Sequence, residues 1–343
     1  GGNYTCSSNW STGTFNHILK AENTEVVING GTFDATVGGT NNAMINVSEN
    51  SVVTINAGTF KNVNGVIPQF APYMFTYEKN GKLIINGGDF YGGWRFNGET
   101  ATTDIYGGNF TVSYDGQSFH AASTHVLTIY GGTFSLENGG KLNPANHVAD
   151  GYEALTNTQE NKYYVVPTTD ANVVVTTADE LVEALGANKG VYLFNDIKIN
   201  PANMSNAYGK TGINVKNGQT IDGGGHTLNI QGAGGTWDSG INTTGGLIKN
   251  ITITGSFRGI FINHTSTHSE KVVLDNVTIG GNGTVYTISC DQGLYQGIEA
   301  TNCTFNGWTS FAKTAGEAKF VNCSFGEGSG YKYCRPYSNT EFV

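Results

Sequence analysis

The sequence predicts an all-β protein, a parallel β-helix (β-solenoid) made of two arrays of stacked coils. The first observation is a phrase that recurs, and the second is that each copy alternates apolar and polar residues as a strand does. The copies read EVVINGGTF, SVVTINAGTF, KLIINGGDF, TDIYGGNF and HVLTIYGGTF, and lie at 25–33, 51–60, 82–90, 103–110 and 125–134. A unit that recurs but cannot bury its own apolar face must stack on copies of itself.

Each copy consists of a β-branched strand, a turn with one or two glycines, a small polar residue and a phenylalanine. The phenylalanines recur 18 to 30 residues apart when a degenerate first copy, WSTGTF, which ends at Phe15, is included. Stacked coils lie about 4.8 Å apart, so equivalent residues should stand above one another. We therefore expect an internal column of Phe33, Phe60, Phe90, Phe110 and Phe134, and a solvent-facing column of Thr32, Thr59, Asp89, Asn109 and Thr133.

The composition favours an extracellular β-rich protein. Among 343 residues, 13% are charged, 49 are glycine, and the formal net charge is −9. The only arginines are Arg95, Arg258 and Arg335, and no run of basic residues occurs, so we expect no nucleic-acid or anionic-membrane partner. No apolar stretch approaches the roughly 20 residues that cross a bilayer.

The cysteines predict neither zinc nor a disulfide framework. Their number is odd and no CxxC pair occurs; they are Cys6, Cys290, Cys303, Cys323 and Cys334. Cys303 and Cys323 occupy equivalent positions in NCTF and NCSF, so they should lie one above the other with parallel Cβ vectors. That geometry is poor for a disulfide, and buried free thiols are the preferred interpretation.

The first array is assigned to residues 1–165. Its longest interval, 66–81, contains Pro68 and Pro72 and is interpreted as a projecting loop. Aromatic residues there and in the next loop could form a platform for sugar rings or a protein partner; alternatively, they pack against the flank of the array. The candidate ligand-binding residues are Tyr73, Tyr77, Tyr91, Trp94 and Arg95.

The second array is assigned to residues 166–343. The glycine phrase breaks at 151–170, where YYVV is read as a strand that closes the first array. Thr177 can cap a helix whose first turn carries Asp179 and Glu180 and whose apolar face includes Leu181 and Leu185. Such a helix would cover the open core of the first coil.

A different phrase repeats in the second array. LIKNITI, VLDNVTI, EATNCTF and KFVNCSF place an asparagine in register, at Asn250, Asn276, Asn302 and Asn322. Asparagine tolerates left-handed corners, and its amide can bond to the coils above and below, so we expect an asparagine ladder inside the bend. The last residues, TEFV, align with AKFV at 318–321, so the sequence is expected to stop in mid-coil.

The opening helix and strand, TIDGGGHTL at 220–228 and the asparagine ladder resemble the right-handed parallel β-helices of the pectate-lyase-like superfamily. The INGGTF coils with such a domain appended also resemble adhesive regions of large surface proteins of gut bacteria, and phage fibre and spike proteins. The resemblance implies the fold, but that fold carries lyases, hydrolases, adhesins and passive fibres alike. The resemblance is also compatible with a homo-oligomer, which would be a trimer if the chain is part of a phage fibre.

Lyases of this fold would need clustered acidic residues for Ca²⁺ beside a basic residue, and hydrolases would need closely set aspartates. Candidates for such chemistry are Arg258, Asp291, Glu299 and Asp222, but the sequence contains no dense carboxylate run. His264 and His268 in HTSTH are read as a solvated loop. We therefore predict no catalytic residue, no metal site and no cofactor. Ca²⁺ binding remains an alternative that no cluster of acidic residues in the sequence supports.

The sequence thus favours a non-enzymatic extracellular β-solenoid, an adhesin or fibre component of a cell surface or virion. Its loops would bind a glycan or a host or cell-surface protein through many weak contacts. The alternative is a polysaccharide lyase or glycoside hydrolase whose second array is catalytic. Trp237 and Trp308 stand alone in glycine-rich segments and are either lids or sugar contacts.

Overall fold

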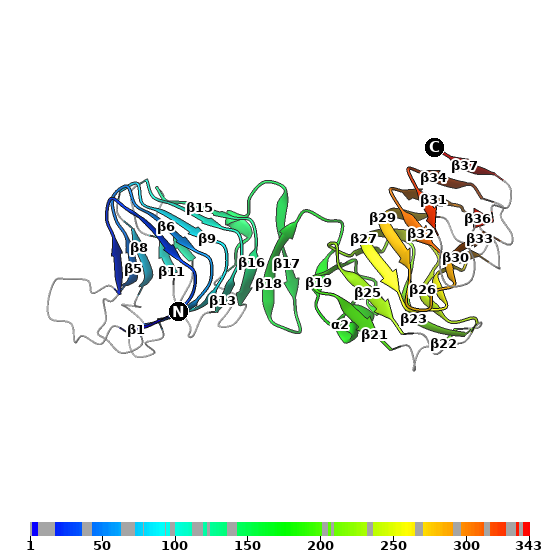
Figure 1. Cartoon of the computed structure of the whole chain (residues 1–343), viewed down its shortest axis with the longest axis horizontal. Coiled ribbons are helices and arrows are strands. Elements are labelled where there is room, and N and C mark those ends of the chain that lie inside the picture. The colour runs from blue at the N-terminus through cyan, green and yellow to red at the C-terminus, as the bar shows by residue number, and fades with distance from the viewer. Residues whose placement is uncertain are drawn as a thin grey trace. The chain divides into compact units, whose positions relative to one another are not determined.

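The protein consists of two compact units, residues 1–168 and 169–343, each built from stacked short strands (Figure 1). The architecture comes from a computed structural model, in which no helix of the described residues is long and apolar enough to cross a membrane. The described residues are 2–5, 18–35, 43–62, 73–77, 79–92, 94–96, 100–111, 119–121, 124–135, 143–200, 205–206, 209–231, 236–264, 270–290, 296–311, 316–326, 334–335 and 339–343.

The first unit is a parallel β-solenoid, as the sequence predicted, and its coils pair on three sides. Each glycine phrase supplies two strands, one before the corner and one after it. The strands before the corner are β3 (Glu25–Ile28), β6 (Val52–Ile55), β9 (Lys82–Ile85), β12 (Thr102–Ile105) and β15 (Val126–Ile129). Those after it, preceded by β1 (Asn3–Thr5), are β4 (Thr32–Asp34), β7 (Thr59–Asn62), β10 (Asp89–Gly92), β13 (Asn109–Thr111) and β16 (Gly132–Ser135). The third side holds β2 (Leu19–Ala21), β5 (Ala43–Val47) and β8 (Tyr73–Tyr77), together with the pair β11 (Trp94–Phe96) and β14 (Phe119–Ala121).

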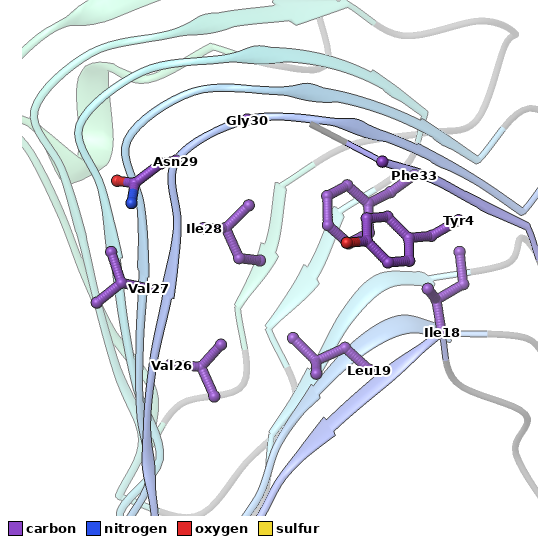
Figure 2. A pocket seen from close by; sticks show the side chains of 10 residues that line it. Tyr4, Ile18, Leu19, Val26, Val27, Ile28, Asn29, Gly30 and Phe33 are labelled. Atoms are coloured by element: carbon purple, nitrogen blue, oxygen red, sulfur yellow. The ribbon is translucent and has the colours of Figure 1, made fainter.

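The predicted phenylalanine column is confirmed. Successive rings from Phe33 to Phe134 stack at centroid distances of 4.8, 4.9, 4.9 and 4.7 Å. Tyr4 adds a further ring, 4.8 Å from Phe33, and Figure 2 shows these two rings lying one on the other. The apolar core of the first unit therefore runs from coil to coil along one aromatic column.

The interpretation of 66–81 as a projecting loop is wrong for residues 73–77, which form β8. This strand pairs in parallel with β5, and its Met74 and Phe75 are buried in the core. The Phe75 ring lies 6.3 Å from that of Phe90, which explains why these apolar residues turn inward. Phe15, Pro68 and Pro72 lie outside the described residues.

An antiparallel hairpin closes the first unit. It is formed by β17 (Tyr152–Asn157) and β18 (Lys162–Pro167) and follows a short 3₁₀ helix, η1 (Ala145–His147). Strand β18 also runs antiparallel to β16, and this reverses the parallel stacking of the coils. The YYVV segment is thus the closing strand that the sequence predicted.

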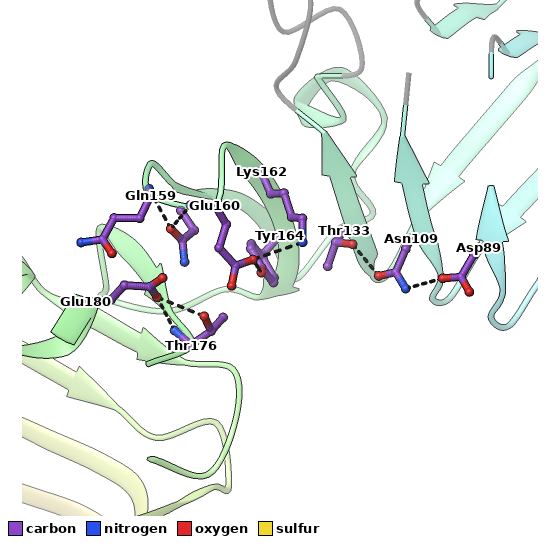
Figure 3. Close-up of polar contacts among 10 residues, drawn as sticks. Asp89, Asn109, Thr133, Gln159, Glu160, Lys162, Tyr164, Thr176 and Glu180 are labelled. Atoms are coloured by element: carbon purple, nitrogen blue, oxygen red, sulfur yellow. Dashed lines mark hydrogen bonds and ion pairs between the residues drawn. The ribbon is translucent and has the colours of Figure 1, made fainter. Parts of the chain in front are cut away.

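The second unit begins with β19 (Val173–Val175) and the predicted helix, α2 (Ala178–Gly186). The hydroxyl of its N-cap, Thr177, accepts a bond from the Glu180 backbone N–H. The Glu180 carboxylate in turn accepts from the backbone N–H of Thr176 at 2.7 Å (Figure 3). Leu181 and Leu185 are buried, and α2 packs against the strands of the first coils.

Two sheets, which we call the first and the second ladder, build the rest of this unit, and the first ladder holds two runs of parallel pairs. One contains β20 (Val191–Leu193), β21 (Ile197–Ile199), β24 (Thr220–Asp222), β25 (Thr227–Ile230), β27 (Gly246–Thr254), β29 (Val272–Gly280), β31 (Ile298–Thr301), β32 (Thr304–Asn306), β34 (Ala318–Val321), β35 (Ser324–Gly326) and β37 (Thr340–Phe342). The other contains β22 (Ser205–Asn206), β23 (Gly209–Val215), β26 (Ser239–Thr243), β28 (Arg258–Ile262), β30 (Tyr286–Cys290), β33 (Trp308–Phe311) and β36 (Cys334–Arg335). Only β22 and β23 among the pairs of this second ladder are antiparallel.

The asparagine register of the second unit is confirmed, but the expectation that the ladder lies inside the bend is wrong, because Asn250 is half-buried and the other three asparagines are exposed. Asn250, Asn276, Asn302 and Asn322 have φ values of 52°, 54°, 56° and 51°, in the left-handed region. The amide of Asn276 donates to the side-chain oxygen of Asn250 at 3.1 Å, and Asn322 donates to Asn302 at 2.7 Å. These bonds lie on the solvent side of the corner. The asparagines therefore fix the bend of each coil from outside.

Candidate ligand-binding site

A column of polar and aromatic side chains lies just before the glycine corner of the first unit. The amide of Asn56 donates to Asn29 at 2.7 Å, and that of Asn86 donates to Asn56 at 2.8 Å. The column continues with Tyr106 and Tyr130, whose rings stack at 4.7 Å and 8°. All three asparagines are exposed, and Tyr106 is 51% exposed. We call this set the amide–tyrosine column.

A second column lies just after the corner, at the positions that the sequence predicted to face solvent. The amide of Asn109 donates to the carboxylate of Asp89 at 2.8 Å, and the Thr133 hydroxyl donates to Asn109 at 2.7 Å (Figure 3). Asn109 is exposed, and Thr32, Thr59 and Asp89 are half-buried. The prediction that this column faces solvent is wrong for Thr133, which is buried. We call this set the threonine–aspartate column.

A shallow groove of about 630 Å³ lies over the glycine corner that separates the two columns in sequence; its lining includes Thr32, Thr59, Asp89 and Asn109 of the threonine–aspartate column but no member of the amide–tyrosine column. Its floor is backbone and glycine, because the corner excludes side chains. Gly88 has φ +121°, and a Cβ there would lie 3.0 Å from the carbonyl oxygen of Gly58 on the neighbouring coil. Ala57 shows that one floor position does accept an exposed Cβ. The groove therefore exposes donors and acceptors that repeat at the coil spacing.

A different cavity, of about 660 Å³, opens at the first coil (Figure 2). Its lining includes Ile18, Leu19, Ile28 and Phe33, whose equivalents in later coils form the core. Figure 2 shows these side chains pointing to the inside of the coil. We therefore assign this cavity to the core and not to a ligand.

One of the predicted ligand-binding residues lies close to the groove. Tyr91 follows Asp89 by two positions on β10, is 37% exposed, and is in register with Lys61 and Thr111 of the adjacent coils. For the other four only the backbone is described, Tyr73 and Tyr77 in β8 and Trp94 and Arg95 in β11, so their role stays a prediction.

Asp222, a catalytic candidate, is part of a buried polar cluster. It is 4% exposed, and its carboxylate accepts from the Thr169 hydroxyl at 2.6 Å, the Gly224 backbone at 3.1 Å and the Asn250 amide at 3.2 Å. Lys249 lies 3.4 Å from it and 2.8 Å from Asp170. Asp222 therefore joins the start of the second unit to two of its coils.

The electrostatics of this cluster favour a permanent ion pair. Burial lowers the pKa of Lys249, but its bonds to Asp170 and the negative charges of Asp222 and Asp170 outweigh burial, so its pKa is raised. Burial and the charge of Asp222 also raise the pKa of Tyr192. A lysine held in its charged form is suited to anchoring and not to accepting a proton.

The remaining catalytic candidates do not come together with Asp222. Arg258 lies on β28, in the other ladder of strands, and is 5% exposed. Glu299 is on β31 and forms an exposed ion pair with Lys271, at 3.9 Å, on the neighbouring coil. Asp291 lies outside the described residues. The structure thus unites none of the three described candidates in one groove.

No group of three His, Cys, Asp or Glu side chains within the described ranges could hold a metal ion. The interpretation of HTSTH as a solvated loop is wrong for His264, which is 1% exposed; His268 is outside the described residues. Cys303 and Cys323 are free thiols, as predicted; Cys303 is buried, but Cys323 is only half-buried. Burial raises the pKa of Cys303 to about 12.

The groove was not predicted from the sequence, although its signal was present in the repeated phrase. The residue before the glycines is Asn in the first three copies and Tyr in the last two. Only the registered stacking of coils shows that these residues form one column on the surface.

Comparison with known proteins gives one finding for the second unit. Residues 172–286 match the family described as a putative pectate lyase-like adhesive domain. Comparison with curated proteins and with solved structures gave no match. The resemblance to a pectate-lyase-like β-helix is confirmed for this region, and it agrees with the parallel coils and the opening helix.

Proposed function

We propose that this chain is an extracellular adhesive β-solenoid that binds an extended glycan along the corner groove of its first unit. The observation that carries the proposal is the groove over the glycine corner, which the threonine–aspartate column lines, with the exposed amide–tyrosine column immediately before the same corner. The adhesive-domain match in residues 172–286 supports the general class of function. A bacterial cell surface or a virion is the proposed location.

The chemistry of the two columns suits sugar hydroxyls. Each side-chain amide has two N–H donors and a carbonyl oxygen with two lone pairs, and a ladder bond uses only one donor or one lone pair at each end. The remaining donors and acceptors of Asn56, Asn86 and Asn109 are at the surface. Asp89 adds a strong acceptor.

The coil repeat suits a polymer better than a single sugar. Successive coils lie about 4.8 Å apart, which is close to the length of one pyranose unit in an extended polysaccharide. Neighbouring sugars would then meet equivalent groups on neighbouring coils. Each contact would be weak, but several linked contacts give a much higher overall affinity.

A substitution that fills the groove tests the proposal. Ala57→Gln adds a long side chain at an exposed floor position, whereas Thr54→Gln adds the same group on the outer face of β6 in the same coil. We would measure retention of the whole chain on immobilised neutral and acidic polysaccharides, with and without Ca²⁺. The expected result is an affinity about tenfold weaker for Ala57→Gln and unchanged for Thr54→Gln.

Two outcomes would overturn the proposal. If Ala57→Gln binds as the original chain does, the groove is not the glycan site. If no polysaccharide retains the chain, the glycan-binding function itself is wrong. Release of new reducing ends or unsaturated products during the incubation would instead favour the lyase or hydrolase alternative.

A further inference from the structure

A second cluster of aromatic side chains, in the second unit, surrounds Arg258. The first residues of three neighbouring strands are in register, Arg258 on β28, Tyr286 on β30 and Trp308 on β33. The rings of Tyr286 and Trp308 stack at 4.6 Å and 20°. Arg258 lies next in the column, and the indole of Trp237 lies beside it.

The guanidinium of Arg258 lies over the rings of Trp237 and Tyr286. Its central carbon lies 4.5 Å from the ring centroid of Trp237 and 4.8 Å from that of Tyr286. Its Nε donates to the carbonyl oxygen of Thr236 at 3.0 Å, and Nη1 donates to the hydroxyl of Ser289. Cation–π attraction is strongest when the cation is withdrawn from water, and Arg258 is 5% exposed.

These contacts fix the position of an indole that stays accessible. Trp237 is 47% exposed although one of its faces lies over the guanidinium. The bond to Thr236 also holds the backbone directly before it. The ring is therefore held before any ligand arrives, and pre-organisation reduces the entropy that binding costs.

We infer that Trp237 is a carbohydrate-binding residue, that a pyranose ring packs its C–H face on the exposed indole, and that Arg258 is a positioning residue for it. A flat, rigid and amphipathic ring suits a ligand that is apolar on one face and carries hydroxyls at its edge. This inference extends the proposed adhesive function to a second site. It does not depend on the groove, which lies in the other unit.

A purely structural role would have different consequences. If the aromatic cluster around Arg258 only stabilised the packing of neighbouring coils, loss of Trp237 would change the stability of the protein and leave sugar binding unchanged. Loss of the Arg258 side chain would likewise change stability and leave sugar binding unchanged. The two interpretations therefore predict different binding of short sugars, which can be measured on variants that are shown to be folded.

The experiment is a titration of the whole chain with cellotetraose, a β-1,4-galactotetraose and trigalacturonate. Binding is monitored by calorimetry and by tryptophan fluorescence. Trp237→Ala should weaken binding by at least about tenfold. Tyr4→Ala is the matched control, because Tyr4 is 48% exposed in the first unit, and it should bind as the original chain does. Far-ultraviolet circular dichroism would verify that each variant is folded.

Two further variants separate the roles. Trp237→Phe keeps a smaller ring over Arg258 and should bind with intermediate affinity. Arg258→Met keeps apolar volume but loses the bonds to Thr236 and Ser289; it should weaken binding while raising the mobility of Trp237, seen as lower fluorescence anisotropy.

Ala57→Gln, which fills the groove, should bind these short sugars normally, so failure of the groove proposal is distinguishable from failure of this one. Unchanged binding by Trp237→Ala would overturn the inference. So would the absence of binding by the original chain to all three probes at millimolar concentration.

Discussion

The phenyl rings of Phe90 and Phe110 lie 4.9 Å apart and only 5° from parallel. Phe90 also stacks on Phe60, at 4.9 Å, and is fully buried. Both faces of its ring are therefore covered by equivalent rings of the coils on either side. This arrangement makes the phenylalanine column the part of the first unit where coil-to-coil packing can be measured most directly.

Phe90→Ala should destabilise the first unit by about 3–5 kcal/mol, the range for removing a buried phenylalanine. Phe90→Leu keeps most of the apolar burial but loses two stacked pairs, each contributing about 0.5–1.5 kcal/mol. Hydrogen exchange over residues 1–168 and 169–343 should show the loss in the first unit alone. A leucine variant as stable as the original chain would mean that the stacking geometry contributes nothing.

Periodic positions could be predicted from the sequence because stacking in register repeats one environment in every coil. Phe33 to Phe134 and Asn250 to Asn322 are each explained by such a position, an apolar column inside or a left-handed corner outside. The cap at Thr177 could be predicted because helix capping depends on residues only three apart.

Contacts set by irregular segments could not be predicted. The third side of the first unit follows the corner at variable distance, so β8 carries no repeated phrase, and its place depends on pairing with β5. The contact of Trp237 with Arg258 likewise depends on coil stacking, because neither residue belongs to the repeated phrase of its coil. The groove of the first unit is different, because its residues belong to the repeated phrase; there the sequence named the threonine–aspartate positions but not the groove that they line.

The asparagine ladder predicts two separable effects at Asn276. Asn276→Gly keeps a residue that adopts the φ of 54° freely and removes only the side-chain bond to Asn250, so about 0.5–1.5 kcal/mol should be lost. Asn276→Ala adds the strain of a left-handed alanine, about 1–2 kcal/mol more. Urea unfolding of the two variants gives the difference, and equal stability of the alanine and glycine variants would refute the role assigned to φ.

Cys303 should resist thiol reagents while the protein is folded. Its pKa is raised to about 12, mainly by burial, so the reactive thiolate is a very small fraction at pH 8. Treatment with iodoacetamide followed by peptide mass analysis should leave Cys303 unmodified, and the same treatment in concentrated urea should label it. Native labelling as fast as that in urea would contradict the burial of this thiol.

The stability of the first unit should depend on pH through His125. This side chain is buried, and its Nε2 lies 3.0 Å from the hydroxyl of Thr103. Burial, followed by the nearby charge of His147, lowers its pKa from 6.5 to about 4. Between these two values the unfolded chain binds a proton that the folded chain does not, so stability rises with pH across the window.

The free energy of unfolding should accordingly be constant above about pH 6.5, fall as the pH is lowered towards 4, and level off below that. The loss from His125 is at most about 3 kcal/mol, less the share screened by solvent. His125→Gln keeps a polar partner for Thr103 but does not titrate, so the difference between the two denaturation curves isolates the histidine from carboxylates that titrate nearby. Parallel curves for both proteins from pH 4 to 7 would show that His125 is not held neutral by the fold.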